Sequence, residues 1–353
     1  MSRVLLAAVG DANDPSVYSG TPFHCLQAGR MLGVIDAGLP LETRSRGWMY
    51  RRRGWNLIQL LTRLEKGGYQ YSESFLNRLW RRAKLRSDDK LVNMFQLYPS
   101  SLFEQHEGAM WFYIDQTLHQ LFYEYSVADK VGSRIASDAL ERERAQYAQA
   151  TGIICSNDWA AQDVRQRYAI REERVHVIRY GANLDTGALA GWEDQHADSL
   201  GERHRNIGQQ PAADIPVRFL FIGKEWHRKG LDRLLRALNM ARAGGARAEL
   251  VVVGLDPHNL PPDLASTSGV TWVGYIDKRS EPRRFLELVA SCDVGCLLSR
   301  AEAGAISLRE FCRLGLPTIA PAVGGSPEYV YKPAADLVAP DAPDEEIAAI
   351  ITR

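Results

Sequence analysis

Apolar runs alternate with helix-patterned segments along most of the chain, and this alternation restricts the fold more than any other feature. The clearest case begins at residue 217, where VRFLFIG is followed by the helical pattern LDRLLRALNMARAG and then by AELVVVG. Runs that are apolar at every position are typical of strands buried on both faces of a parallel sheet. The sequence therefore predicts an α/β protein built from doubly wound parallel sheets.

The length of the chain and one change in composition divide this alternation into two lobes. A chain of 353 residues can form two domains, each with its own core. Residues 184–216 are polar and interrupted by glycine and proline, which is typical of a linker. We therefore expect two Rossmann-like lobes, residues 1–183 and 217–353, joined by this linker.

The composition indicates the class of protein but does not identify a binding partner. Lys plus Arg and Asp plus Glu number 43 each, so the net charge is zero. No apolar run approaches the ~20 residues of a membrane span, and the N-terminus has no signal-peptide core. The five cysteines lack the paired spacing of a zinc site, which favours free thiols in a reducing compartment. We therefore expect a cytoplasmic protein.

A cluster of cations follows the first strand of the C-terminal lobe. In FIGKEWHRKG, Gly223 ends the strand, and Lys224, Arg228 and Lys229 precede the next helix. Ligands of doubly wound sheets bind where strands end and helices begin. Cations beside unpaired helix N–H groups would suit a phosphate or diphosphate. A solvated basic turn is the alternative for this stretch.

Two carboxylates flank a second junction, in SRAEAGAISLREF. Glu302 lies in the predicted loop, and Glu310 lies about one turn into a helix that we expect to begin near Ala305 or Ile306. The small residues Gly304 and Ala305 would let backbone amides approach a ligand closely. A carboxylate can accept two hydrogen bonds from a vicinal diol, so this loop could hold two sugars on either side of a diphosphate. Surface glutamates favoured by the helix dipole are the alternative.

These motifs together resemble a known family. GKEWHRKG, the E-x7-E of EAGAISLRE and GLPTIAPAVGGSPEYV resemble the retaining glycosyltransferases of family 4, and the likeness is best over residues 150–335. The resemblance implies a GT-B fold, with an N-terminal acceptor-side lobe and a C-terminal nucleotide-sugar-binding lobe facing a cleft. It also implies transfer of a hexose-type sugar, with retention, to the hydroxyl of a glycan, a lipid-linked molecule or a small molecule.

The resemblance also assigns roles to the C-terminal residues. Lys229 matches the phosphate-binding lysine, and Lys224 occupies a place where the family usually has arginine. Glu310 matches the glutamate on the nucleotide ribose, and Glu302 matches the one facing the donor sugar. Tyr275 lies where family members contact the nucleobase, largely through backbone.

The amide loop departs from the family pattern. By resemblance, residues 304–307, ending at Ser307, supply amides to the sugar and the diphosphate. The family usually has glycine at the fourth position of the motif, whereas this chain has Gly304 at the third and Ala305 at the fourth. This exchange makes the fit of the sugar uncertain.

The N-terminal lobe carries a weaker match. Ser19 and Gly20 resemble a flexible loop that approaches the diphosphate. Many family members have a histidine near the anomeric carbon at the end of the strand WFYID, but this chain has Asp115 there and His119 four residues on. Asp115 could orient the donor sugar or the attacking hydroxyl, or it could cap a helix.

The mechanism implied by the family needs no cofactor and no metal. The nucleotide-diphosphate sugar is a co-substrate, with UDP or GDP expected, and no acidic cluster in the sequence suggests a metal site. Three other readings stay open, namely a sugar-nucleotide epimerase of the same fold, a non-catalytic nucleotide-sugar-binding protein and a nicotinamide dehydrogenase. The dehydrogenase lacks support because GxGxxG does not follow the first strand.

Residues 44–86 are strongly basic, with ten Arg, two Lys and two Glu, and tryptophans are interleaved among them. This pattern suits an anionic acceptor or the inner face of the plasma membrane, whereas nucleic acid has no supporting motif. A plain solvated basic face is the alternative.

The C-terminal stretch EEIAAIITR predicts a helix whose apolar side chains need a partner. Family members usually continue with further helices, the last of which crosses back onto the N-terminal lobe. We therefore expect either a truncated chain or lobes joined only by residues 184–216. A single connection would leave a cleft that opens widely without the donor.

Overall fold

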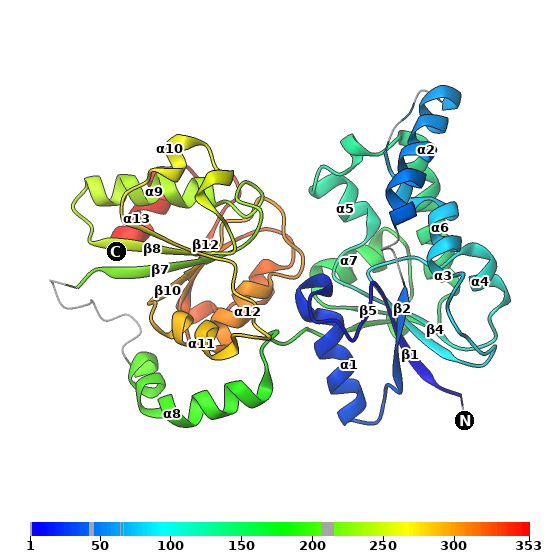
Figure 1. The fold of residues 1–353 in the computed structure, drawn as a ribbon, viewed down its shortest axis with the longest axis horizontal. Coiled ribbons are helices and arrows are strands. Elements are labelled where there is room, and N and C mark those ends of the chain that lie inside the picture. Colours follow the sequence, from blue (N-terminus) through cyan, green and yellow to red (C-terminus); the bar gives the residue numbers. More distant parts are fainter. Residues whose placement is uncertain (1, 42–45, 64, 66, 206–214) are drawn as a thin grey trace. The chain divides into compact units, whose positions relative to one another are not determined.

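The computed structural model describes residues 2–41, 46–63, 65, 67–205 and 215–353. Contacts along the chain divide it into two compact units, Met1–Tyr180 and Gly181–Arg353. Each unit contains one parallel sheet with helices packed on it (Figure 1). The predicted α/β class with two parallel sheets is therefore confirmed.

The N-terminal unit is built on a six-stranded sheet with the order β2-β1-β3-β4-β5-β6. Its strands are β1 (Val4–Val9), β2 (Ala37–Leu41), β3 (Lys90–Met94), β4 (Met110–Ile114), β5 (Gly152–Cys155) and β6 (Val175–Val177). Its helices of six or more residues are α1 (Thr21–Met31), α2 (Arg46–Arg63), α3 (Glu73–Trp80), α4 (Ser100–Gln105), α5 (Leu118–Glu124), α6 (Ser133–Gln149) and α7 (Asp158–Gln166). Leu5 and Leu6 of β1 enter different apolar clusters, which explains why this run is apolar at successive positions.

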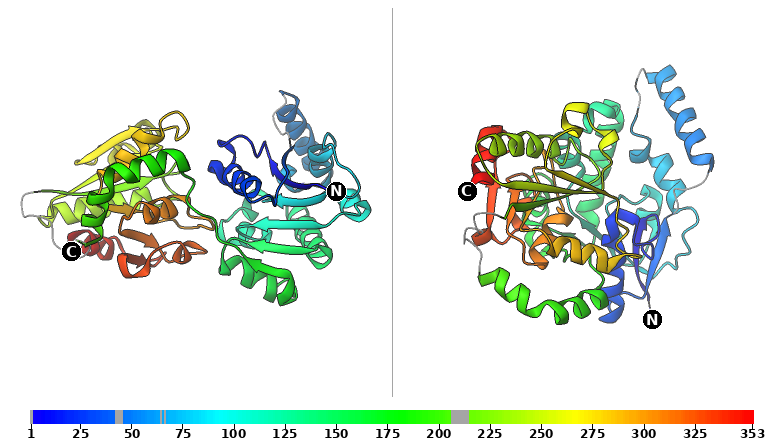
Figure 2. Two further views of the ribbon diagram at one scale, coloured as in Figure 1. Left: turned by 90° about the horizontal axis from the view of Figure 1, so that it is seen from below. Right: turned by 60° about the vertical axis from the view of Figure 1, so that its left-hand side comes forward.

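The C-terminal unit has a second six-stranded parallel sheet, with the order β12-β11-β10-β7-β8-β9. Its strands are β7 (Val217–Ile222), β8 (Ala248–Val253), β9 (Val270–Gly274), β10 (Val294–Cys296), β11 (Thr318–Pro321) and β12 (Ala335–Val338). Its helices are α8 (Thr186–Arg205), α9 (Leu231–Ala243), α10 (Pro262–Ala265), α11 (Pro282–Ala290), α12 (Ile306–Arg313) and α13 (Asp344–Thr352). Helices α9 and α13 pack side by side on one face, and α11 and α12 lie on the other (Figures 1 and 2).

The strand orders locate the point in each sheet where ligands are expected. In the C-terminal sheet, the chain runs outward in one direction from β7 and then returns to start again at β10, so the topology switches between these neighbours. In the N-terminal sheet the switch lies between β1 and β3. Loops after the strands at a switch point diverge and leave an open crevice. The loop after β7 carries the predicted cations, and the loop after β10 carries Glu302.

The predicted linker contains a helix, so this prediction is wrong for residues 186–205. Asp185 begins α8 by accepting a hydrogen bond from the Ala188 amide at 2.7 Å. Leu189 and Trp192 are then buried in the core of the C-terminal unit. The burial of these two side chains stabilises a helix whose glycines and polar residues resemble a linker. Residues 206–214 lie outside the described part of the chain.

The terminal helix α13 is also more fully packed than its sequence suggested. Ile347, Ala348 and Ile351 are buried in the same core, where α13 contacts α9. The expectation that these apolar side chains need a further partner is therefore wrong, and Ile350 is half-buried in the same place.

Candidate functional site

The loops after β7 and β10 are held together by their backbones. The Arg300 amide donates to the Arg228 carbonyl at 2.8 Å, and the Leu298 amide donates to the Lys229 carbonyl at 3.3 Å. Gly230, the residue after Lys229, adopts φ 73°, and a Cβ atom there would lie 2.0 Å from the Leu298 carbonyl oxygen. Only glycine permits this conformation and approach, so Gly230 brings Lys229 to the second loop.

A bidentate ion pair also connects the loop after β10 to the first turn of α9. The Arg300 guanidinium donates to both carboxylate oxygens of Asp232, each at 2.8 Å. Burial alone would raise the pKa of Asp232, but the bonds from Arg300 outweigh it and leave that pKa below its usual value. Sequence reasoning missed both residues, because nothing in their spacing connects positions 68 residues apart.

Glu302 is buried at the centre of this junction. Lys229 Nζ and Ser299 Oγ donate to its Oε2, the latter at 3.1 Å, and the Ala305 amide donates to its Oε1 at 3.2 Å. Arg228 Nη1 lies 3.6 Å from Oε2. Burial would raise the pKa of Glu302, but the two cations outweigh it and lower the pKa, which keeps the carboxylate ionised at neutral pH. The structure thus brings together the predicted Lys229, Arg228 and Glu302.

The loop that follows Glu302 has the geometry of a close-approach segment. Ala305 adopts φ 34° and ψ 54°, a left-handed conformation that costs a non-glycine residue roughly 1–2 kcal/mol, and α12 starts immediately after it at Ile306. Helix α12 therefore begins where the sequence placed it. The left-handed residue is the one at which the resemblance expects glycine. Gly304 and Ile306 are half-buried, whereas Ser307 is buried.

The loop after β11 joins the same junction. Gly325 donates its amide to the Glu302 carbonyl at 3.2 Å, and Gly324 adopts φ 52°. Three strand ends of the C-terminal sheet therefore meet at Glu302.

The second predicted carboxylate, Glu310, also has a lysine partner. Its side chain is 1% exposed, and Lys278 Nζ donates to its Oε1. Lys278 also reaches the Asn183 carbonyl at 3.4 Å. Sequence reasoning missed Lys278, because it lies in the loop after β9 without a motif around it.

Lys224 and Tyr275 form a more exposed pair. The ammonium of Lys224 lies 4.5 Å from the centre of the Tyr275 ring, which is 60% exposed. Gly223 lies between the end of β7 and this lysine, and its amide donates to the Val253 carbonyl at 3.0 Å. The predicted nucleobase position and the predicted second cation are therefore neighbours.

In the N-terminal unit, Asp115 follows β4 directly. The capping alternative for Asp115 is wrong for α5, because Thr117 Oγ1 accepts the Gln120 amide at 3.2 Å and forms the cap. Asn157 Nδ2 donates to the Asp115 carbonyl at 2.9 Å and fixes this strand end. His119 lies in the first turn of α5, where burial and a neighbouring cation lower its pKa and favour the neutral ring.

Ser19 and Gly20 lie in an unusual loop at the switch point of the N-terminal sheet. Tyr18, Ser19 and Gly20 adopt φ values of 45°, 55° and 90° in succession. The Tyr18 ring lies 4.9 Å from that of Phe95, which directly follows β3. Burial and then the Asp115 charge raise the pKa of Tyr18 to about 12. Such successive left-handed residues store strain that is typical of functional loops.

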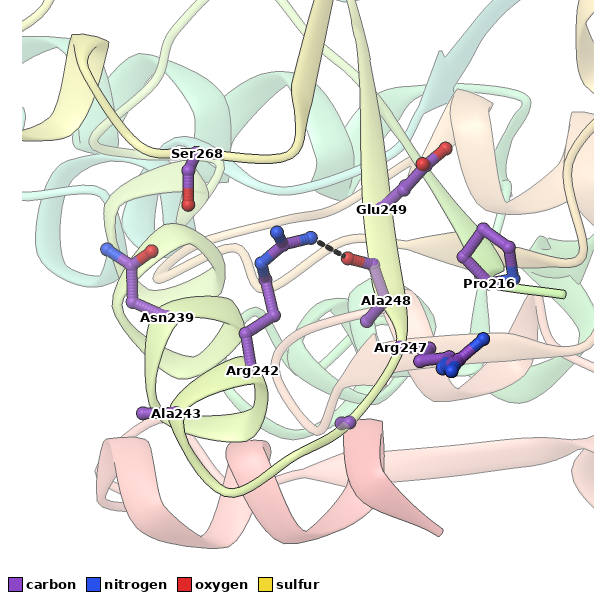
Figure 3. A pocket seen from close by; sticks show the side chains of 9 residues that line it. Pro216, Asn239, Arg242, Ala243, Arg247, Ala248, Glu249 and Ser268 are labelled. Carbon is purple, nitrogen blue, oxygen red and sulfur yellow. Dashed lines mark hydrogen bonds between the residues drawn. The ribbon is translucent and has the colours of Figure 1, made fainter. Parts of the chain in front are cut away.

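A hollow in the C-terminal unit lies away from this chemistry. It opens at the amino ends of β7 and β8, the sheet edge opposite the Lys229 loop, and its lining includes Pro216, Asn239, Arg242 and Ser268 (Figure 3). Arg242 Nη1 donates to the Ala248 carbonyl at 2.5 Å. Because ligands of such sheets bind at the carboxyl ends of strands, we place the site at the Glu302 junction instead.

The described residues contain no group of three or more His, Cys, Asp or Glu side chains arranged to hold a metal ion. Nor does any helix in this part of the chain combine the length and apolar character needed to cross a membrane.

Comparison with known proteins connects this arrangement to one family. The family model for glycosyl transferases group 1 matches residues 216–353. The chain is 24% identical over 213 residues to an MMP alpha-(1->4)-mannosyltransferase of Mycolicibacterium hassiacum, which covers 60% of this chain and 44% of that protein. It is 26% identical over 194 residues to the lipopolysaccharide glucosyltransferase WaaG of Escherichia coli, covering 54% and 49%. The chain thus matches about half the length of these curated relatives.

Solved structures extend the likeness of fold to nearly the whole chain. An alpha,alpha-trehalose 6-phosphate synthase from Burkholderia multivorans matches with a TM-score of 0.59 and 13% identity, over 99% of this chain and 90% of that one. The apo form of the lipopolysaccharide outer core galactosyltransferase WaaB matches with a TM-score of 0.54 and 13% identity, over 99% and 89%. Residues 216–353 thus match the family model for glycosyl transferases group 1, and the fold of nearly the whole chain is the GT-B fold of these solved structures.

Proposed function

We propose that the chain is a retaining hexosyltransferase that moves a sugar from a nucleotide-diphosphate sugar to an acceptor hydroxyl. The observation that carries this proposal is the ion pair between the half-buried Lys229 and the buried Glu302, at the switch point of the C-terminal sheet. A cation and an ionised carboxylate side by side suit the two halves of such a donor, the anionic diphosphate and the hydroxylated sugar. The named activities of the curated relatives, mannosyl and glucosyl transfer, support the same class.

The charges that develop during the reaction define the role of the cations. As the anomeric C–O bond breaks, positive charge grows on the sugar and negative charge on the leaving diphosphate. Lys229 and Arg228 stabilise that negative charge, and Lys224 adds a further cation near Tyr275. Together they supply without a metal the charge that a divalent ion would otherwise supply.

Retention follows from attack on the same face of the sugar. The acceptor oxygen bonds to the anomeric carbon on the side that the diphosphate leaves, and the acceptor proton passes to an oxygen of that diphosphate. This route needs no nucleophile from the protein. Glu302, ionised at neutral pH, accepts hydrogen bonds from donor-sugar hydroxyls, and Asp115 orients the sugar or the attacking hydroxyl.

When the donor binds, its groups replace the internal partners of two charged side chains in the site. The diphosphate competes with Glu302 for Lys229, and the nucleotide ribose competes with Lys278 for Glu310. These internal pairs hold four charged side chains in place before the donor arrives, which lowers the ordering cost of binding. The expected acceptor is a glycan, a lipid-linked molecule or a small molecule.

The transferase proposal predicts that nucleotide is released only when both an active donor and an acceptor are present. A screen of UDP-, GDP- and ADP-sugars by thermal shift identifies the donor, and coupled nucleotide detection then measures turnover with and without candidate acceptors. NMR of the product should show the anomeric configuration of the donor. Acceptor-independent formation of free nucleotide and a rearranged sugar would instead assign an epimerase.

Metal removal should leave transfer intact. Because Lys229, Arg228 and Lys224 supply the positive charge, we expect turnover in excess EDTA to stay within about twofold of the untreated rate. The measurement is initial rate with EDTA, followed by addition of magnesium or manganese. Loss of activity with EDTA and its return with either ion would contradict the metal-free mechanism.

A further inference from the structure

Helix α2 turns its apolar side chains toward solvent. Trp48 and Trp55 pack against the core of the N-terminal unit, whereas Tyr50, Leu57 and Leu61 are 69%, 56% and 74% exposed. Figure 1 shows α2 as an outlying helix of this unit. On a helix of a water-soluble domain, the face away from the core is normally polar, so this distribution is reversed.

Three of the exposed apolar residues lie on one side of the helix. Tyr50, Leu57 and Leu61 are separated by seven and four residues and so lie along one line of the helix. The large apolar side chains that α2 exposes are Met49, Tyr50, Leu57, Ile58, Leu60 and Leu61. Several large apolar side chains exposed on one helix indicate a surface that is covered in the working protein.

Cations accompany this surface, and the sequence of α2 contains no acid. Arg51, Arg52 and Arg53 are all exposed, and the helix sequence RGWMYRRRGWNLIQLLTR has neither Asp nor Glu. Arg52 lies over the Trp48 ring at 5.5 Å, toward the core side of the helix. Its two neighbours, Arg51 and Arg53, project from the helix on either side of the line formed by Tyr50, Leu57 and Leu61.

The charge decides between the possible partners. A second copy of this face would place arginines against arginines without acidic residues of α2 to pair with them. An anionic lipid surface satisfies both features at once, because its headgroups attract the arginines and its acyl boundary accepts the leucines. We propose that α2 lies in the interface of an anionic membrane, with Leu57 and Leu61 at its centre.

This proposal goes beyond sugar transfer and stands on its own observations. It concerns only contacts of α2 and is measured without donor or acceptor, so its failure would leave the proposed reaction intact. It also chooses among the three interpretations of residues 44–86, in favour of the lipid surface over a solvated face.

Co-sedimentation with vesicles tests the apolar part. We expect the whole chain to bind phosphatidylglycerol-containing vesicles at least tenfold more strongly than pure phosphatidylcholine vesicles. Leu57→Ser with Leu61→Ser should reduce binding to the anionic vesicles at least tenfold. Met31→Ser with Leu32→Ser is the matched control, since these side chains at the end of α1 are 86% and 76% exposed, and it should leave binding unchanged.

The charged part has its own variant. Arg51→Gln with Arg53→Gln should lower binding to anionic vesicles about tenfold and reduce its dependence on salt. All variants should keep the circular dichroism and melting temperature of the parent chain, because each altered side chain is exposed. Equal binding to neutral and anionic vesicles, or full binding by the double serine variant, would overturn the proposal. A vesicle-free dimer that the double serine variant dissociates would assign the face to a second copy instead.

Discussion

Replacing Lys229 with alanine should weaken nucleotide-sugar binding by roughly ten- to a hundredfold. The ammonium lies at the switch point, and a charge-assisted contact with the diphosphate contributes about 1.5–3 kcal/mol. Turnover should fall as well, because the same contact strengthens while negative charge grows on the leaving group. Calorimetric titration with the identified donor measures the first effect, and initial rates measure the second.

The same substitution should also change stability. Without Lys229, Glu302 is a buried carboxylate held by Ser299 and the Ala305 amide, with Arg228 at 3.6 Å. Breaking a buried ion pair by removing one partner costs on the order of 3 kcal/mol. Since burial then outweighs the remaining cation, the pKa of Glu302 should rise. Because Glu302 of the folded variant then binds its proton more tightly than in the unfolded chain, the variant should be more stable at acidic pH than at neutral pH.

A double variant separates binding from stability. Lys229→Ala with Glu302→Gln removes the stranded charge, so it should recover most of the lost stability but not the donor affinity. Lys332→Ala is the control for removal of an exposed lysine in the same unit and should behave as the parent chain. Unchanged donor affinity in Lys229→Ala would refute the site, whatever its effect on melting temperature.

The sequence identified those strands whose burial leaves a continuous apolar pattern. VRFLFI and AELVVV are central or paired on both sides in the sheet, and their side chains enter the core on both faces. The strands β2, AGLPL, and β12, ADLV, were not predicted. Both lie at a sheet edge, where one side needs no hydrogen-bond partner and proline or a polar residue is tolerated.

The candidate site was predictable to a similar extent. Lys229 and Glu302 could be found because each lies in a loop between a strand and the next helix, at the sheet's carboxyl edge, and the chain order alone brings such loops together. The partners Lys278 and Arg300 could not be found, because side-chain pairing across distant loops leaves no periodicity. Helix α8 was also missed, because only the tertiary burial of Leu189 and Trp192 distinguishes it from a linker.

The N-terminal unit should lose stability as the pH rises from about 4.5 to about 7, and Glu143 is the expected source. This side chain is 2% exposed and accepts hydrogen bonds from the Leu118 amide and the Tyr147 hydroxyl, both at 2.9 Å, and from the Tyr168 hydroxyl. Burial is the main cause that raises its pKa from 4.5 to about 7, against those hydrogen bonds, and the nearby Asp163 charge raises it further.

The direction of the effect follows from which state releases the proton more easily. The unfolded chain ionises Glu143 near pH 4.5, whereas the folded chain holds the proton to about pH 7. The stabilising contribution is therefore complete below pH 4.5 and is lost as the pH rises through 7. The difference between the two pKa values corresponds to on the order of 3 kcal/mol. Leu118 begins α5 three residues after Asp115, so ionisation of Glu143 acts beside the proposed acceptor-side residue.

Glu143→Gln should therefore remove most of this pH dependence. The amide keeps the shape of the side chain and can still bond Leu118 and the tyrosines, but it has no proton to release in this range. Urea unfolding at several pH values between 5 and 8, monitored with a spectroscopic probe in the N-terminal unit, measures the free energy of unfolding at each pH. The parent chain should lose about 3 kcal/mol across this range. Glu143→Gln should lose much less, and Glu141→Gln, at an exposed position of α6, should behave as the parent. Equal slopes for the parent and Glu143→Gln would show that Glu143 is ionised in the folded chain throughout, and that its burial is offset by its hydrogen bonds.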